Sequence, residues 1–94
     1  MGEYYAICDM KTKTFYDPQD RLGAKLWEIF ANDGANFIAW LGGHVWEHGD
    51  IQLIGDYDDM RDSKPWCDDG LCAEGWIDLT REIDGLYCRW SMIP

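Results

Sequence analysis

The chain has 94 residues, 47% of them apolar, and its 18 acidic residues outnumber eight basic ones to give a net charge of −10. This size suits one domain, residues 1–94, with a hydrophobic core, and leaves no room for a second domain. So strong a negative charge disfavours direct binding to nucleic acid or to an anionic membrane and favours a basic protein partner. The alternative interpretation is that the acidic residues serve only to keep the protein soluble.

No membrane segment or export signal is expected. The sequence has no run of 18 or more apolar residues. Its start, MGEYYAICDMKTK, lacks the basic beginning and long apolar stretch of a signal peptide. We therefore expect the protein in the cytoplasm, or in the host cytoplasm if it is viral.

Three strands are predicted in the first two thirds of the chain. Residues 3–9 (EYYAICD) and 14–17 (TFYD) are rich in aromatic and aliphatic residues, so they are expected to pair as a hairpin across a polar turn. Pro18 ends the second strand because it cannot donate a ladder hydrogen bond. Alternating residues at 50–57 predict a third strand, placed centrally in the sheet.

A helix is predicted within residues 20–34 (DRLGAKLWEIFANDG). Asp20 is the expected N-cap, and Asn32-Asp33-Gly34 is a stop signal. The apolar residues at i, i+4, i+7 and i+8, which share one helical face, are Leu22, Leu26, Ile29 and Phe30. The next apolar run, residues 35–43, is too short for its period to separate a buried strand from a helical turn.

A second helix is predicted within residues 76–90, with Asp78 as its N-cap. Its apolar face consists of Leu79, Ile83, Leu86, Tyr87 and Trp90. Residues 58–75, rich in Asp and Gly, are interpreted as a loop, and so long a loop is uncommon unless it is functional or tied down. The predicted fold class is α+β, a small antiparallel sheet with two helices packed on one face.

The spacing of two histidines and two cysteines suggests a zinc site. Zinc is held tetrahedrally by imidazoles and thiolates, and His44, His48, Cys67 and Cys72 supply two close pairs. Such a site would pin the long loop. Here the histidine pair precedes the cysteine pair, the reverse of their order in a zinc finger, and the Cys-x4-Cys spacing is longer than the usual Cys-x2-Cys. The alternative is that the protein binds no cofactor.

A disulfide between Cys67 and Cys72 is the competing interpretation, because CDDGLC contains turn residues that could close a small ring. Four cysteines allow three pairings, and an ordinary cytosol would keep all of them reduced. Cys8 and Cys88, on a predicted strand and a predicted helix, are expected to be small core residues.

Acidic residues gather after position 49. We expect seven of them to face a basic protein partner: Asp50, Asp56, Asp58, Asp59, Asp62, Asp68 and Asp69. Calcium is a weaker interpretation, because an EF-hand loop beginning at Asp56 would have Arg61 where glycine is required and Cys67 where glutamate is required.

The leading functional hypothesis is a non-enzymatic interaction protein that binds this basic partner. The alternative is a small zinc- or disulfide-stabilised binding module. A hydrolase that uses a carboxylate and a histidine is the third hypothesis, although the sequence has no phosphate-binding loop, nucleophile elbow or HExxH motif.

Four segments, MGEYYAICDMKTKTFYDP, GAKLWE, GDIQLIGDYDD and WIDLTREI, resemble a family of short uncharacterised prokaryotic and mobile-element proteins. That family begins with a Met-Gly-x-Tyr-Tyr strand and has a Gly-x-Lys-Leu-x-Glu helix and a Gly-Asp-Tyr turn. The resemblance covers most of the chain and implies no activity, and the cysteines and histidines are outside its pattern. A mobile-element origin would suit an acidic mimic of nucleic acid.

Overall fold

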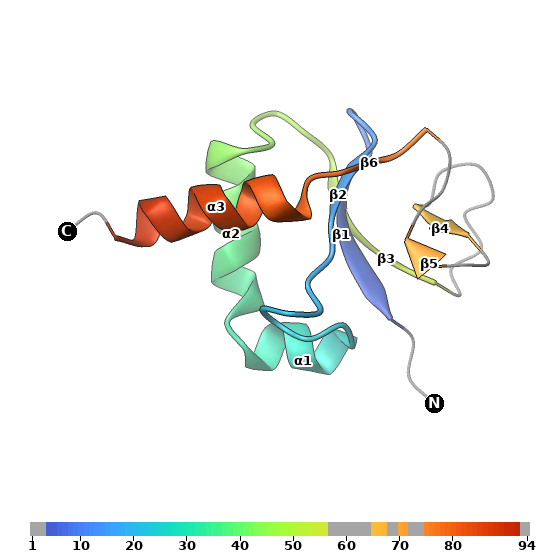
Figure 1. Cartoon of the computed structure of the whole chain (residues 1–94), viewed down its shortest axis with the longest axis horizontal. Coiled ribbons are helices and arrows are strands. Elements are labelled where there is room, and N and C mark those ends of the chain that lie inside the picture. Colours follow the sequence, from blue (N-terminus) through green and yellow to red (C-terminus); the bar gives the residue numbers. More distant parts are fainter. Residues whose placement is uncertain (1–3, 57–64, 68–69, 72–74, 93–94) are drawn as a thin grey trace.

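The computed structural model describes residues 4–56, 65–67, 70–71 and 75–92, which form three helices and six strands. Figure 1 shows the helices α1, α2 and α3 gathered on one side of the main sheet and the small strands β4 and β5 on the other. The predicted α+β class is confirmed.

The main sheet has four strands in the order β3-β1-β2-β6. These strands are β1 (Tyr5–Asp9), β2 (Thr14–Tyr16), β3 (Ile51–Gly55) and β6 (Ile77–Asp78). The hairpin of β1 and β2 is confirmed, and β3 is antiparallel to β1. Two details differ from the prediction: β6 joins β2 in parallel, and β3 lies at the edge of the sheet because β1 is the strand that pairs on both sides.

Both faces of this sheet are covered. Ile7 is opposite Tyr16 in the register, and their side chains join the helical cluster. The neighbouring residues Cys8 and Phe15 face the other way and pack with Ala6 and Ile54. This alternation is the period of two that a strand imposes. Every residue from 6 to 9 is therefore buried.

Helix α1 (Leu26–Ala31) is shorter than predicted. The backbone N–H groups of residues 21–23 all donate to the carbonyl of Pro18, so this segment forms a turn instead of the first turn of a helix. Gly23 has φ +96°, a left-handed conformation that suits glycine. The prediction of Asp20 as the N-cap is therefore wrong, and Lys25 occupies that position.

Helix α2 (Gly34–His44) resolves the ambiguous run 35–43 as a helix. The stop signal ends α1 as predicted, but Asp33, with φ 69°, then starts α2 directly. A Cβ atom added to Gly34 would lie 2.3 Å from the carbonyl oxygen of Ile29. Glycine at this position therefore lets the two helices meet closely.

Helix α3 (Thr80–Ser91) confirms the second predicted helix. Asp78 accepts a hydrogen bond from the Thr80 N–H at 2.9 Å but precedes the N-cap, Leu79, by one residue. Of its predicted apolar face, Ile83 is buried, whereas Leu86 and Trp90 are largely exposed.

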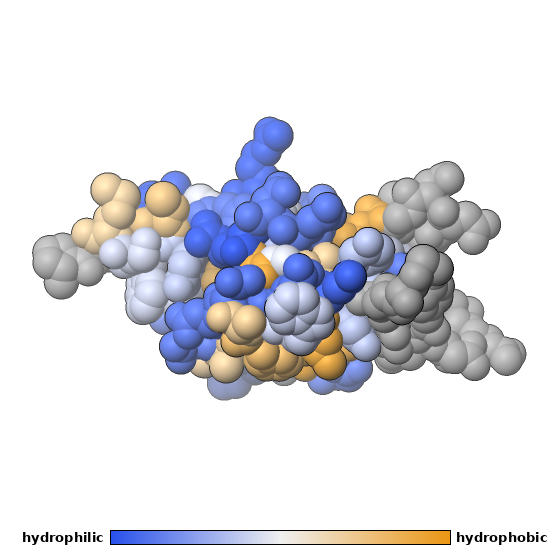
Figure 2. All heavy atoms as spheres, turned by 90° about the horizontal axis from the view of Figure 1, so that it is seen from below, coloured by the Kyte–Doolittle hydropathy of each residue, from blue (hydrophilic) through white to orange (hydrophobic). Residues whose placement is uncertain are grey.

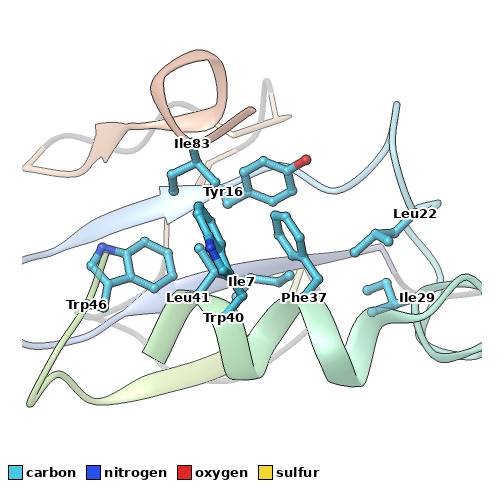
Figure 3. Packing of buried hydrophobic residues seen from close by; sticks show 9 residues of the cluster. All are labelled: Ile7, Tyr16, Leu22, Ile29, Phe37, Trp40, Leu41, Trp46 and Ile83. Carbon is cyan, nitrogen blue, oxygen red and sulfur yellow. The ribbon is translucent and has the colours of Figure 1, made fainter. Parts of the chain in front are cut away.

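The main core lies between the sheet and the helices, where rings pack at centroid distances near 5 Å, as for Tyr16 and Phe37 (4.9 Å). Figure 3 shows the side chains of this cluster converging: Ile7, Tyr16, Leu22, Ile29, Phe37, Trp40, Leu41, Trp46 and Ile83.

The opposite face of the sheet carries a short hairpin of β4 (Trp66–Cys67) and β5 (Gly70–Leu71). Trp66 and Leu71 pack against the second cluster, and the Trp66 indole N–H donates to the carbonyl of Ile54 at 2.9 Å. The segment 58–75, predicted to be a loop, thus contains two short strands in its described part, and the remainder lies outside the described residues.

The turn after β1 is organised by Asp9, whose side chain is only 1% exposed. One carboxylate oxygen accepts from the N–H groups of Lys11 (3.3 Å) and Asp50 (2.8 Å), and the other from the N–H and hydroxyl of Thr12. A Cβ atom on Gly49 would lie 2.6 Å from Asp9 Oδ1, so only glycine permits this approach.

Candidate functional site

The structure describes two of the acids predicted to bind a partner, and they lie at opposite ends of β3. Asp50 is exposed and accepts from Gln52 Nε2, whereas Asp56 accepts from the Tyr4 N–H at 3.2 Å. A strand rises about 3.4 Å per residue, which separates them by roughly 20 Å, so they do not form one patch. The other predicted acids, Asp58, Asp59, Asp62, Asp68 and Asp69, lie outside the described residues.

The predicted zinc site is described only at its histidines, because Cys72 and the side chain of Cys67 lie outside the described residues. His44 Nδ1 is 3.1 Å from the Trp40 carbonyl, and its ring stacks on the Trp40 indole. His48 is exposed with φ 60°. Within the described ranges no three or more His, Cys, Asp or Glu residues are grouped to hold a metal. The zinc site stays a prediction.

The two described free thiols occupy contrasting environments. Cys8 is buried as predicted, and burial raises the pKa of its thiol to about 12 despite an opposing backbone hydrogen bond from Ile54. Cys88 is exposed, so the prediction that it is a core residue is wrong. It points away from the apolar face of α3 that Ile83 defines. The predicted bridge between Cys67 and Cys72 falls outside the described side chains.

Helix α1 presents an exposed apolar surface, which we call the α1 patch: Leu26 (41% exposed), Trp27 (69%) and Phe30 (51%). Of this helix only Ile29 is buried. Figure 2, which views the molecule from the side of α1, shows hydrophobic residues gathered near the middle of this face and hydrophilic ones around them. Neighbouring exposed apolar side chains of this size mark interaction surfaces more often than isolated ones do.

Acidic residues outnumber basic ones, three to two, between residues 20 and 33 around the α1 patch in the chain. Asp20 and Asp33 lie on either side of α1 in the chain and are exposed, and Glu28 lies within the helix. The Glu28 carboxylate accepts from the Lys25 N–H at 3.1 Å, which secures the first turn. In the chain the patch is thus flanked by two exposed acids, and Lys25 occupies the N-cap of its helix.

A cavity of about 350 Å³ opens beside the N-terminal end of α1. Its described lining residues are Tyr4, Asp17, Gln19, Ala24, Trp66 and Leu71. Pairing of Tyr4 with Lys25 and donation of the Tyr5 N–H to the Ala24 carbonyl at 2.8 Å tie the start of β1 to this place. The cavity therefore lies where the hairpin β4–β5, the end of β2 and the approach to α1 meet, and its residue Ala24 precedes Leu26 of the α1 patch by two positions.

Asp17 is the charged residue that lines this cavity. Burial raises the pKa of its carboxyl, the Gln19 N–H (3.1 Å) opposes this, and the negative charges of Asp78 and Asp20 raise it further. Its backbone N–H donates to the Thr80 hydroxyl at 2.9 Å, which fixes its position against α3. Neither lysine nor arginine is among the described lining residues.

A second polar group lies on the helical side of the sheet. The buried Tyr16 hydroxyl donates to Asp84 Oδ1 at 2.6 Å, and Arg21 Nε binds the same oxygen at 2.9 Å. The Arg21 guanidinium also lies 5.0 Å from the centroid of the Tyr87 ring. Burial, the bond to Asp84 and its charge together raise the pKa of Tyr16, and Arg21 opposes this. These groups satisfy one another and serve the fold.

Sequence reasoning missed the α1 patch and the cavity. The stripe of Leu26, Ile29 and Phe30 was expected to face the core, but the turn at residues 18–23 shortens the helix and leaves only Ile29 buried. The cavity joins Tyr4 and Trp66, which are distant in the chain, and no sequence signal links them. The seven predicted acids did not include Asp17.

No family model, curated protein or solved structure matches the chain, so the resemblance noted from its sequence stays a prediction. Among the helices formed by the described residues, none has the length and apolar character needed to cross a membrane.

Proposed function

We propose that this chain is a non-enzymatic interaction protein that binds a basic protein partner, with the α1 patch as the centre of the interface. The observation that carries the proposal is the exposure of Leu26, Trp27 and Phe30 on one short helix. Large apolar side chains that form no part of the core gain free energy when a partner covers them.

Charge supports a basic protein as the partner. The chain carries 18 acids and eight bases, and the α1 patch is flanked by Asp20 and Asp33. An interface with an apolar centre and a charged rim selects a partner of opposite charge, because the rim steers association and suppresses like-charged competitors. A partner with an apolar spot inside a basic surface fits this arrangement, and the basic groove of a nucleic-acid-binding protein is one example.

The proposal is tested by affinity capture from cells of the source organism, identification by mass spectrometry, and reconstitution with the purified partner. The variant Trp27→Asp/Phe30→Asp disrupts the α1 patch. The matched control is Met92→Asp, at an exposed apolar residue (77%) at the end of α3. Central aromatic residues contribute about 2 kcal/mol or more, so the patch variant should bind about 30-fold more weakly and the control normally.

Salt supplies the second criterion. Affinity for a basic partner should fall as ionic strength rises from about 0.15 M to 0.5 M, because screening weakens the charged rim. A partner that binds the patch variant as well as the wild type, or whose affinity is unchanged by salt, would contradict the proposal.

A further inference from the structure

The cavity beside the α1 patch has the dimensions and walls of a small binding site. Its volume of about 350 Å³ falls within the range of ligand pockets, roughly 300–1,000 Å³. Tyr4 and Trp66 give it aromatic surface, Ala24 and Leu71 aliphatic surface, and Asp17 and Gln19 polar groups. Aromatic walls with a few polar groups are the common composition of such sites.

The Trp66 side chain offers the cavity the face of its ring and no free hydrogen-bond donor. Its indole N–H is already bonded to the Ile54 carbonyl at 2.9 Å. That bond, together with packing against the second cluster, holds the indole in place. A fixed aromatic ring beside a carboxylate attracts a cation through its π-electrons as well as through charge.

The charged residue that the described lining contributes to the cavity is acidic. Asp17 lines it, and Asp20 from the following turn and Asp78 from β6 act electrostatically on Asp17. The nearest arginine in sequence, Arg21, is held by Asp84 at 2.9 Å and stacks on Tyr87. Arg21 is thus engaged elsewhere, and the described lining of the cavity contains neither lysine nor arginine.

We propose that the cavity receives an arginine side chain of the basic partner, with its guanidinium at the Asp17 carboxylate and its plane against the aromatic walls. This step rests on the proposed function, because it assigns an anchor residue to the same partner. Arginine fits better than lysine, since its planar group binds a carboxylate through two hydrogen bonds, stacks on rings and is more weakly hydrated. Ala24, which lines the cavity, precedes Leu26 of the α1 patch by two residues, which brings both within the reach of one partner.

The test uses three capped tripeptides, Ac-Gly-X-Gly-NH2, with arginine, lysine or citrulline at X, titrated into the full-length protein. Citrulline has nearly the shape of arginine without its charge. Binding is followed by two-dimensional NMR of backbone and indole N–H groups. The arginine peptide should bind with Kd of about 1 mM, a strength reasonable for so small a ligand. The lysine peptide should bind several-fold more weakly and citrulline not measurably.

Variants localise the binding. Asp17→Asn should reduce arginine-peptide affinity at least tenfold, and Trp66→Leu should also reduce it. Asp50→Asn is the charge-matched control because Asp50 is exposed at the opposite end of β3 from Asp56. It should leave affinity within about twofold, in line with weak screened effects of distant surface charges. Equal binding of citrulline, or full affinity in Asp17→Asn with an unchanged spectrum elsewhere, would overturn the proposal.

The pH dependence gives a readout that a structural role of Asp17 would not produce. A bound cation favours the charged carboxylate, so the arginine peptide should lower the pKa of Asp17, measured from its 13C carboxyl shift. Affinity should then fall as pH falls through that pKa and stay flat over this range in Asp17→Asn. An Asp17 titration unchanged by saturating peptide would also overturn the proposal.

The two proposals fail separately. If the arginine peptide does not bind but the partner still depends on Trp27 and Phe30, the cavity inference is wrong and the proposed function stands. If the peptide binds through Asp17 but no basic partner depends on the α1 patch, the proposed function is wrong and the cavity is a site for guanidinium groups in their own right.

Discussion

Two aspartates beside the same β-hairpin show how differently one residue type is used. Asp9 ends β1 and Asp17 follows β2. Asp9 is 1% exposed and accepts hydrogen bonds from Lys11, Thr12 and Asp50. Asp17 is half-buried, accepts the Gln19 N–H, and lines a cavity.

Their pKa values move in opposite directions for this reason. Burial acts to raise the pKa of Asp9, but hydrogen bonds from Thr12, Asp50 and Lys11 outweigh it and lower the pKa. Burial raises the pKa of Asp17, and the single opposing hydrogen bond does not compensate. A carboxylate whose charge the fold already satisfies has a structural role, and one whose charge is left uncompensated is available to a ligand.

The largest expected effect is that of Asp9→Ala. It removes the acceptor from several N–H groups, and unsatisfied buried donors are costly, so the free energy of unfolding should fall by about 3 kcal/mol in urea denaturation. Asp9→Asn, which keeps one acceptor oxygen, should fall between this variant and the wild type. Asp17→Ala is the matched control and should change stability by less than about 1 kcal/mol. Equal losses at the two positions would remove the contrast between them.

The stability of the protein at acid pH should also depend on Asp9. Because the pKa of Asp9 is lowered in the folded state, its contribution is fully present above the ordinary carboxyl pKa of about 4 and is lost as pH falls through the folded value. The free energy of unfolding, measured by denaturation between about pH 6 and 2, should therefore decline below about pH 4. The decline should be shallower in Asp9→Asn. A slope that is identical in wild type and variant would contradict the assignment.

An intermediate effect is expected for Tyr16→Phe. This change removes a buried hydroxyl that donates to Asp84 at 2.6 Å, while Arg21 still pairs with that carboxylate. Hydrogen bonds to charged groups contribute about 1.5–3 kcal/mol, and the partial exposure of Asp84 favours the lower end. Tyr87→Phe, in a ring that packs on Phe37, is the control and should change stability by less than about 0.5 kcal/mol. A larger loss of stability in Tyr87→Phe than in Tyr16→Phe would mean that the measured effect does not come from the hydrogen bond between Tyr16 and Asp84.

The smallest expected effect has the opposite sign. Asp17→Asn removes a charge that burial disfavours and keeps an oxygen for the Gln19 N–H, so it should stabilise the protein at pH 7 by less than about 1 kcal/mol. Thermal unfolding compared with Asp50→Asn checks this. A clear destabilisation would give Asp17 a structural role like that of Asp9.

The local sequence pattern predicted where several strands and helices lie, but it did not predict their exact lengths or what packs against them. Aromatic and aliphatic composition located β1 and β2, alternation located β3, and helical spacing located α3. The length of α1 was missed because the Pro18 carbonyl captures the N–H groups of residues 21–23, a geometry that periodicity does not encode. The run 35–43 was too short for its period to decide, and only the structure shows that it belongs to α2.

The candidate site was the least predictable part. The sequence directed attention to acids after position 49, and the two that the structure describes lie at opposite ends of β3. The cavity instead combines the start of β1, the end of β2 and the hairpin β4–β5. The exposure of Trp27 and Phe30 followed from the tertiary placement of α1.

By itself, the sequence determined the acidic character of the protein, the α+β class and the positions of three of the six strands and two of the three helices. Charge and local pattern are properties of neighbouring residues. Only the tertiary structure decided that, among the described residues, Asp9 accepts four hydrogen bonds and Asp17 one, and which apolar residues of α1 stay in solvent. The burial of a side chain and its hydrogen-bond partners depend on residues that are far apart in the chain. These two factors decide how stable a buried carboxylate is and whether an aromatic ring is exposed to solvent.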